Sequence, residues 1–348
     1  MVYLDYSATT PVDIDVLDTF NEYFDKSIDI EEEKNKIQKL LNTDLEVIFT
    51  SCATESNNMA IKGIANKYKE KGYHIITTKF EHSSVSSPLK YLESLGFIID
   101  YVSLNNGVVD LDNLKTLIND KTILVSICSV DSELGILQPI KEISKICKNH
   151  KIIFHSDMTQ SIGKVDINLN NVDLISLSAH KFYGLKGIGV LLKRKDIELV
   201  PLMYGNKDYN LALIKSLPKA LENIIPSISD NFNYVLNLNK KIRDNLNKYP
   251  NVFINSNDYS IPHILNISVL GVKPETFLHA MEEYDIYLST KSACSSSYDI
   301  SISVYNVTQD LNKAKYSLRI SISYLTTLLE IDLFLKAFNN CYQNLINN

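Results

Sequence analysis

Residues 123–155 read ILVSICSVDSELGILQPIKEISKICKNHKIIFH, and this stretch contains one strand–helix–strand unit. The apolar runs Ile123–Cys128 and Lys151–His155 are short and rich in β-branched residues, which is typical of buried strands. Between them, Ile140–Asn149 repeats apolar residues at helical spacing. A helix between two such strands favours a parallel sheet.

The same alternation extends over the first 200 residues or so. Further strands are predicted at Glu46–Thr50, His74–Thr78, Phe97–Val102, Leu174–Ser178 and Gly189–Lys193, and further helices at Ser56–Lys69, Leu89–Leu95 and Leu111–Leu117. We therefore predict an α/β fold with a mostly parallel seven-stranded sheet flanked by helices. Ligands of such sheets bind beyond the carboxyl ends of the strands.

The pattern changes after about Leu202. Residues 209–249 look helical, with interruptions expected at Pro218 and Pro226. Strands are then predicted at Ile264–Val269 and Ser317–Ile322, and helices at Glu275–Glu283 and Leu328–Leu345. This pattern predicts a smaller α+β domain. We expect a large domain of residues 14–229 and a small domain of residues 1–13 and 230–348. The acidic run Glu31–Glu33 is expected to begin a helix.

Composition and charge argue against a protein that binds nucleic acid or membranes. The chain has 348 residues, of which 45% are hydrophobic and 22% charged, as in a globular protein. Its formal charge is −6, so we expect no binding to nucleic acid and none to anionic membranes. No apolar run reaches the length of a membrane span. The first residues, Met1–Tyr6, lack a basic or long apolar stretch, so we expect no signal peptide.

The five cysteines argue against a cystine framework. They are Cys52, Cys128, Cys147, Cys294 and Cys341, an odd number without a CxxC pair or the spacing of a zinc site. We therefore expect no structural metal and a reducing compartment, the cytoplasm.

Residues 176–184, SLSAHKFYG, give the strongest functional signal. Lys181 follows an apolar strand, beside Ser178 and His180 and before a glycine-rich turn. An isolated lysine at a strand end is most often an ordinary surface residue. This setting instead indicates a lysine held in a pocket and able to form a Schiff base.

Other polar residues follow neighbouring strands. Asp157 is either a helix cap or, in a site for pyridoxal 5′-phosphate (PLP), the partner of the protonated pyridine nitrogen. Residues 49–58 join a strand to a helix, which is either a phosphate site or a simple capping turn. His82 could stack on an aromatic cofactor or be a structural histidine.

Together these segments resemble the cysteine desulfurase family, which belongs to the class V aminotransferase superfamily of fold-type I PLP enzymes. The matching stretches are Tyr3–Pro11, Thr50–Gly63, Glu81–Val85, Phe154–Lys164, Ser176–Gly189, Lys291–Ser296 and Leu318–Ser321. They occur in consistent order from residue 3 to about residue 330. The resemblance implies an enzyme that takes sulfur from L-cysteine, leaving L-alanine and an enzyme persulfide for an acceptor protein or small thiol.

The resemblance also implies residue roles. Lys181 would hold PLP covalently and remove the Cα proton of the substrate. Asp157 would pair with the pyridine nitrogen, Gln160 would contact the ring oxygen, and His82 would stack on the ring. The phosphate would be held by Ala53, Thr54, Ser178 and His180. The substrate carboxylate would bind Arg319, whose planar fork suits it, and Cys294 would accept the sulfur.

The sequence departs from the family pattern in four places. A Gly-Asn-Pro-Ser-Ser segment after the first helix is missing. An Arg-x-Gly-Thr segment, which would reach the phosphate of the partner subunit, is also missing from the region 203–208. Ser132 replaces an Asn that normally approaches cofactor and substrate, and Cys52 replaces a Gly, where a side chain would restrict the backbone. We therefore expect a homodimer whose PLP is held largely by its own subunit, with Asn206 or Lys207 as a partial substitute.

Three functions remain open. The first is a cysteine desulfurase serving iron–sulfur cluster assembly, tRNA thiolation or another pathway. The second is a related PLP-dependent lyase or aminotransferase, although neither reaction needs the nucleophile Cys294. The third is a catalytically impaired, desulfurase-like partner protein, which the missing segments motivate.

Overall fold

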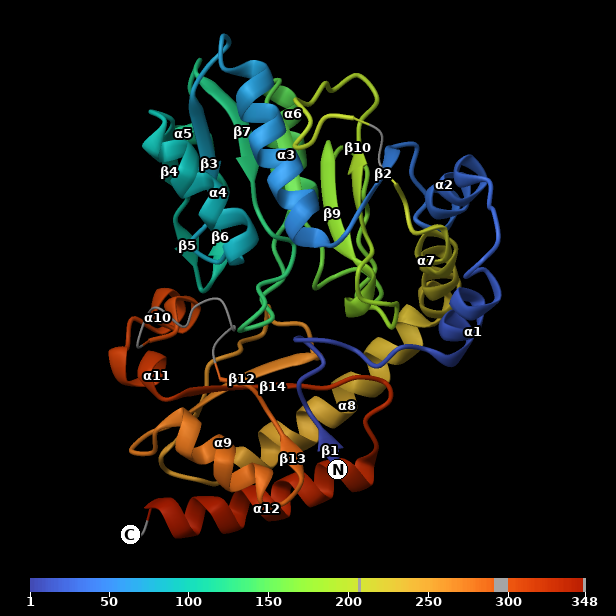
Figure 1. The fold of residues 1–348 in the computed structure, drawn as a ribbon. Coiled ribbons are helices and arrows are strands. Elements are labelled where there is room, and N and C mark those ends of the chain that lie inside the picture. The colour runs from blue at the N-terminus through green and yellow to red at the C-terminus, as the bar shows by residue number, and fades with distance from the viewer. Residues whose placement is uncertain (206–207, 291–299, 347–348) are drawn as a thin grey trace.

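The computed structural model describes residues 1–205, 208–290 and 300–346 (Figure 1). Its main sheet has the order β2-β10-β9-β8-β7-β3-β4. The strands are β2 (Glu46–Thr50), β3 (His74–Thr77), β4 (Ile98–Tyr101), β7 (Thr122–Ser126), β8 (Ile153–Asp157), β9 (Leu174–Ser178) and β10 (Gly189–Lys193). Only β10 runs antiparallel to its neighbours, β2 and β9. The predicted seven-stranded, mostly parallel sheet is confirmed.

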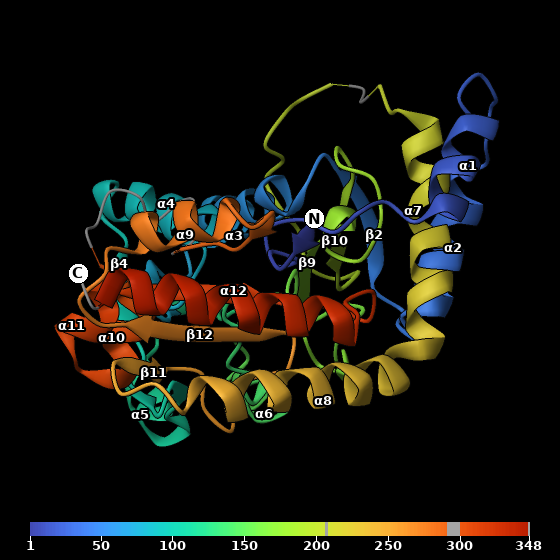
Figure 2. The same ribbon diagram turned by 90° about the horizontal axis from the view of Figure 1, so that it is seen from below.

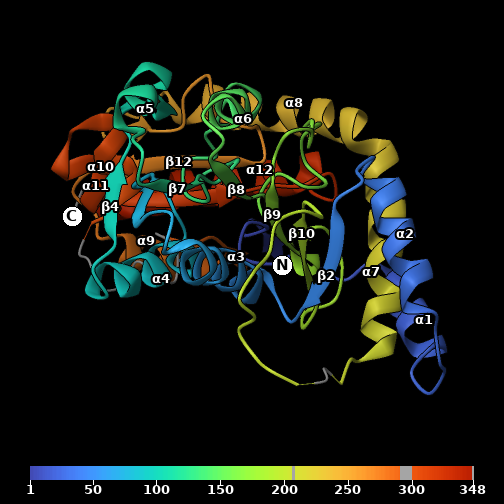
Figure 3. The same ribbon diagram turned by 90° about the horizontal axis from the view of Figure 1, so that it is seen from above.

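Helices cover both faces of this sheet. One face carries α3 (Ala53–Tyr68) and α4 (Ser83–Ser94), and the other carries α5 (Leu111–Leu117) and α6 (Ile140–Asn149), as Figures 2 and 3 show from opposite sides. Strands β9 and β10 are consequently buried along their whole length. Helices α3 and α4 begin earlier than predicted, at Ala53 and Ser83, because their first turns are polar and face the site described below.

Three helices stand together beside β2: α1 (Ile14–Glu22), α2 (Ile30–Leu40) and α7 (Leu211–Ile224). The acidic run begins α2 as predicted, where the Asp29 side chain accepts hydrogen bonds from two backbone N–H groups. The predicted interruption at Pro218 is wrong, since α7 continues through this residue. Pro218 is buried, and α7 packs against α1 and α2, so tertiary packing outweighs the lost backbone hydrogen bond.

A 3₁₀ turn, η2 (Ile225–Ser227), contains Pro226 and separates α7 from α8 (Ile228–Leu246), as predicted. The chain then forms an antiparallel sheet of β11 (Val252–Ile254), β12 (Ile264–Val269) and β14 (Ser317–Ser321). This sheet packs with α8, α9 (Pro274–Glu282) and α12 (Leu328–Ile346) (Figure 2). The predicted α+β architecture of the C-terminal region is confirmed.

Several short elements were not predicted. They are the pair β1 (Val2–Tyr3) and β13 (Ile286–Tyr287), the hairpin β5 (Leu104–Asn105) and β6 (Val108–Val109), and the helices α10 (Ile302–Thr308) and α11 (Leu311–Lys315). The four strands are two residues long each, which is too short to show a hydrophobic period.

The main sheet packs against two buried hydrophobic clusters, and the C-terminal sheet has a core of its own. The larger core includes Phe49 and Phe154, and the smaller one includes Leu4, Leu265 and Phe338. A further buried cluster joins the two regions. It contains Phe80, Cys128, Leu134, Ile136, Val304 and Ala314, and thus ties the chain after β7 to α10 and α11. Among the helices of the described residues, none is long and apolar enough to cross a membrane.

Candidate active site

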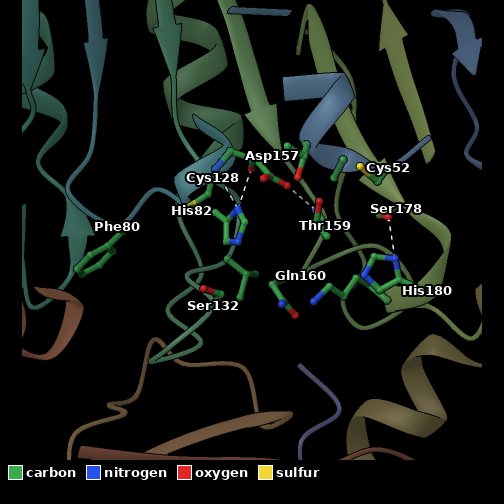
Figure 4. Close-up of a pocket in the computed structure, with 15 residues that line it drawn as sticks. Cys52, Phe80, His82, Cys128, Ser132, Asp157, Thr159, Gln160, Ser178 and His180 are labelled. Carbon is green, nitrogen blue, oxygen red and sulfur yellow. Dashed lines mark hydrogen bonds between the residues drawn. The ribbon is translucent and has the colours of Figure 1, made fainter. Parts of the chain in front are cut away.

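A pocket lies at the carboxyl ends of the strands of the main sheet (Figure 4). Strands β8 and β9 end at Asp157 and Ser178, and the chain leaving β2, β3 and β7 supplies the remaining walls. The lining residues are Cys52, Ala53, Thr54, Phe80, His82, Ser84, Cys128, Val130, Ser132, Asp157, Thr159, Gln160, Ser178, His180 and Lys181. Strands of one direction end at the same sheet edge, which is why segments distant in sequence meet here.

Asp157 is held by two neutral donors. Its Oδ2 accepts a hydrogen bond of 2.7 Å from Asn57 Nδ2 on α3, and its Oδ1 accepts one of 3.0 Å from the Thr159 backbone N–H. The residue is 8% exposed. These contacts orient the carboxylate without cancelling its charge. A carboxylate fixed in this way suits a protonated nitrogen on a cofactor ring.

His82 lies on the same side of the pocket as Cys128 (Figure 4). Its Nδ1 accepts a hydrogen bond of 3.1 Å from the Ser84 backbone N–H, so the proton of the neutral ring is on Nε2. Burial lowers the pKa of His82, an effect that the charge of Asp157 opposes. A neutral, fixed ring suits stacking on an aromatic cofactor.

The other side of the pocket holds Cys52, Ser178 and His180 (Figure 4). Ser178 Oγ lies 3.0 Å from His180 Nδ1. Burial, reinforced by the charge of Lys181, lowers the pKa of His180 to about 4, so its imidazole is neutral near pH 7. The first turn of α3 starts at Ala53 and has no side-chain cap from Cys52, which leaves its N–H groups suited to a phosphate.

The expected backbone restriction at Cys52 is wrong. Its backbone is extended, with φ −175° and ψ 172°, and any residue adopts this conformation without strain. The thiol is therefore accommodated at the start of α3 rather than forced into a glycine conformation.

Lys181 lies in a 3₁₀ turn, η1 (Ala179–Lys181), directly after β9. Its Nζ donates to the backbone carbonyls of Ser7 and Ala8, the latter at 2.8 Å. Gln160 Nε2 also donates to Ser7 O, at 3.0 Å, while Gln160 Oε1 accepts from Lys164 Nζ. The N-terminal segment therefore lies against two of the predicted site residues.

Arg319 is the one described residue of the predicted site that does not line the pocket. It lies on β14, where Nη2 forms an ion pair of 2.7 Å with Asp5 Oδ1 and Nη1 donates to Ser132 O at 3.0 Å. Ser132 itself lines the pocket, so Arg319 borders it through this contact. The nucleophile predicted at Cys294 and the substitutes predicted at Asn206 and Lys207 lie outside the described residues.

Sequence reasoning missed the pocket residues Phe80, Ser84, Cys128 and Thr159, and also Asn57, which holds the pocket residue Asp157. For Asn57 a signal existed. It shares a helical face with Ala53, Ala60 and Ile64, so an amide on this apolar stripe is buried and needs a polar partner.

The comparisons with known proteins agree with this geometry. The family model "Aminotransferase class-V" matches residues 2–334. The chain is 38% identical to a cysteine desulfurase IscS of Buchnera aphidicola subsp. Schizaphis graminum (strain Sg), over 99% of this chain and 93% of the relative. A solved NifS-like protein has a TM-score of 0.92 at 30% identity, with 99% and 100% of the two chains covered. The structure titled "SspA in complex with cysteine" has a TM-score of 0.81 at 28% identity, with 94% and 100% covered.

The fold and the pocket define an α/β enzyme built around a cofactor with an anionic group and a protonated ring nitrogen. The chain belongs to the aminotransferase class-V family, and its cofactor is PLP. The pocket fits this cofactor, because an oriented carboxylate, a flat neutral histidine, an uncapped helix start and a lysine converge on it.

Proposed function

We propose that this chain is a cysteine desulfurase, which converts L-cysteine to L-alanine and keeps the sulfur as a persulfide on Cys294. The observation that carries this proposal is the convergence of Lys181, Asp157 and His82 on one pocket. The presence of Cys294 in the sequence and the cysteine desulfurase relatives support sulfur transfer over the other reactions of the family.

Bound PLP supplies an electron sink for the negative charge that develops on the substrate. Asp157 would pair with its ring nitrogen, and His82 would cover one face of the ring. Its phosphate would be held by Ala53, Thr54, Ser178 and His180. Lys181 would bind the cofactor covalently and would also move the Cα proton of the substrate. The amide of Gln160 is oriented by Ser7 and Lys164, and its NH₂ group would face the ring oxygen.

The sulfur step balances without an external oxidant. The Cys294 thiolate forms a bond to the substrate sulfur, the C–S bond breaks, and its electron pair stays on Cβ, which takes up a proton. One thiol and one cysteine thus give one persulfide and one alanine. Arg319 and Ser132 would hold the substrate carboxylate during this transfer, and Arg319 would first have to share its guanidinium between Asp5 and the substrate.

A product assay separates the candidate functions. A desulfurase incubated with L-cysteine and a reducing thiol forms alanine and sulfide in equal amounts. A related lyase forms pyruvate instead, and an aminotransferase depends on a keto acid. The catalytically impaired partner protein forms none of these products. Alanine without added keto acid is the expected result, and pyruvate as the main product would contradict the proposal.

The proposed assembly is a homodimer in which each PLP phosphate is held by its own subunit. The proposal is motivated by the missing Arg-x-Gly-Thr segment and by Ala53, Thr54, Ser178 and His180, which all line the pocket. An experimental structure with PLP tests it: a side chain of the partner subunit on the phosphate would contradict the proposal.

Three further points belong to the proposal. The division into residues 14–229 and residues 1–13 plus 230–348 is supported by the two main cores, which separate along the same lines. A cytoplasmic location is supported by the free thiols of Cys52, Cys128, Cys147 and Cys341. The sulfur would pass to an acceptor protein or small thiol, with iron–sulfur cluster assembly as one destination.

A further inference from the structure

The tripeptide Asp131–Glu133 joins the pocket to helix α10. Ser132 lines the pocket, whereas the carboxyl groups on either side of it accept hydrogen bonds from the start of α10. Ser303 Oγ donates to Asp131 Oδ1 at 3.0 Å, and Ser301 Oγ donates to Glu133 Oε2. These acids and serines are at most 6% exposed, so water does not compete for the contacts.

The contact is reinforced on both sides. Asp131 Oδ2 accepts hydrogen bonds from the backbone N–H groups of Glu133 and Leu134, which fixes the turn of the tripeptide. Leu134 packs with Val304 of α10 in one buried cluster. Polar and apolar contacts therefore hold the tripeptide and α10 as one unit.

The start of α10 follows the residue proposed as the nucleophile closely in the sequence. In the sequence, Cys294 precedes the anchored Ser301 by seven residues. On its other side, Ser289 exchanges backbone hydrogen bonds of 3.2 and 2.7 Å with Arg319, whose Nη1 donates to Ser132 O. The described chain before and after residues 291–299 is thus connected to the same tripeptide.

We propose that Asp131 and Ser303 are a positioning pair, which fixes the chain after Cys294 relative to the pocket and so sets the rate of sulfur transfer. The inference rests on the proposed function and deepens it. It also gives a role to Asp131, which precedes Ser132, one of the departures from the family pattern. The buried Asp131 accepts a hydrogen bond from Ser303 and so connects the tripeptide to α10.

The variant Ser303→Ala tests the pair with a small change. It removes one hydroxyl and leaves the Ser301 cap of α10 in place. We expect kcat for alanine formation and the single-turnover rate of Cys294 persulfide formation to fall about fivefold to tenfold, the size of one net hydrogen bond. The KM for L-cysteine and the visible absorbance of bound PLP should stay unchanged, because the pocket residues are untouched.

Thr308→Ala is the matched control. It removes a hydroxyl from the same helix, and that hydroxyl donates within α10, to Val304 O. The control should keep the wild-type kcat. Asp131→Ala should lower kcat in the same direction as Ser303→Ala, and the double variant should be no slower than Asp131→Ala alone, because both changes remove one contact.

The possible results distinguish the positioning pair from the proposed desulfurase function. A wild-type kcat and persulfide rate in Ser303→Ala would overturn the positioning pair while leaving the desulfurase proposal intact. An equal loss in Thr308→Ala, or weakened PLP binding in Ser303→Ala, would also overturn it, because the effect would then be one of general stability. A wild-type protein that forms neither alanine nor persulfide would overturn the proposed function and the inference together.

Discussion

Asn57 on α3 donates a hydrogen bond of 2.7 Å to the carboxylate of Asp157 at the end of β8. The same amide donates to Ser84 Oγ at 2.8 Å, and Asn57 is fully buried. Asn57 therefore links three segments of the pocket and sets the direction of the carboxylate that would meet the PLP ring.

Asn57→Ala should weaken PLP binding. A hydrogen bond to a charged group contributes about 1.5–3 kcal/mol, so a loss of about tenfold or more in affinity is expected. Titration of the apo protein with PLP measures the effect. Asn58→Ala is the control, since the amide of this neighbouring residue bonds only to backbone carbonyls. Equal affinities for Asn57→Ala and wild type would contradict the role of Asn57.

Lys181→Ala should abolish both turnover and covalent attachment of the cofactor. The motivation is the position of Lys181 in the pocket, directly after the end of β9. Borohydride reduction followed by peptide mass spectrometry should place PLP on the Lys181 peptide of the wild type and nowhere in the variant. Lys186→Ala, a change in the same loop but outside the pocket lining, should retain the label. PLP attached to another lysine in the wild type would contradict the assignment of Lys181 as the residue that binds PLP covalently.

Glu81 should make stability depend on pH. Burial raises the pKa of Glu81 from 4.5 to about 8, although hydrogen bonds from Cys128 and Thr78 oppose this shift. Between these values the folded chain keeps a proton that the unfolded chain releases. The free energy of unfolding therefore falls as pH rises through this window, by up to about 1.4 kcal/mol per pH unit.

Glu81→Gln removes this titration and should flatten the profile. The free energy of unfolding of the variant minus that of wild type should be larger at pH 8 than at pH 5. Urea unfolding of the apo protein measures both values. Glu93→Gln is the control, because Glu93 is an exposed residue at the end of α4. Parallel pH profiles for wild type and Glu81→Gln would show that Glu81 does not titrate in this window.

Arg319→Lys should impair substrate binding more than cofactor binding. The guanidinium contacts both Asp5 and Ser132 O, and a lysine cannot reproduce this planar fork. We expect the KM for L-cysteine to rise about tenfold, with PLP affinity within about twofold of wild type. Arg243→Lys, remote from the pocket, is the control. An unchanged KM would show that Arg319 does not bind the substrate carboxylate.

The sequence predicted the sheet well because its strands are short apolar runs. Leu174–Ser178 and Gly189–Lys193 are buried throughout and match their predicted bounds. Helix α3 starts earlier than predicted because Thr54 and Glu55 interrupt the apolar period. Local propensity predicts a break at Pro218, because it does not include the packing of α7 against α1 and α2.

The pocket was predicted where residues follow strand ends, as Asp157 and Ser178 do. Contacts between distant segments were not predictable from local patterns. Asn57 and Asp157 are separated by 100 positions, and Asp131 and Ser303 by 172. Such pairs depend on how α3 and α10 pack against the sheet, which no residue pattern within either segment specifies.

Mass spectrometry of the Cys294 peptide tests directly whether Cys294 accepts sulfur from L-cysteine. The holoenzyme is incubated with one equivalent of L-cysteine, trapped with an alkylating reagent and digested, and alanine is measured in the same sample. We expect one added sulfur on the Cys294 peptide in step with alanine, and none in Cys294→Ser, which should still bind PLP. Alanine formation at the wild-type rate in Cys294→Ser, or persulfide on Cys52 instead, would contradict it.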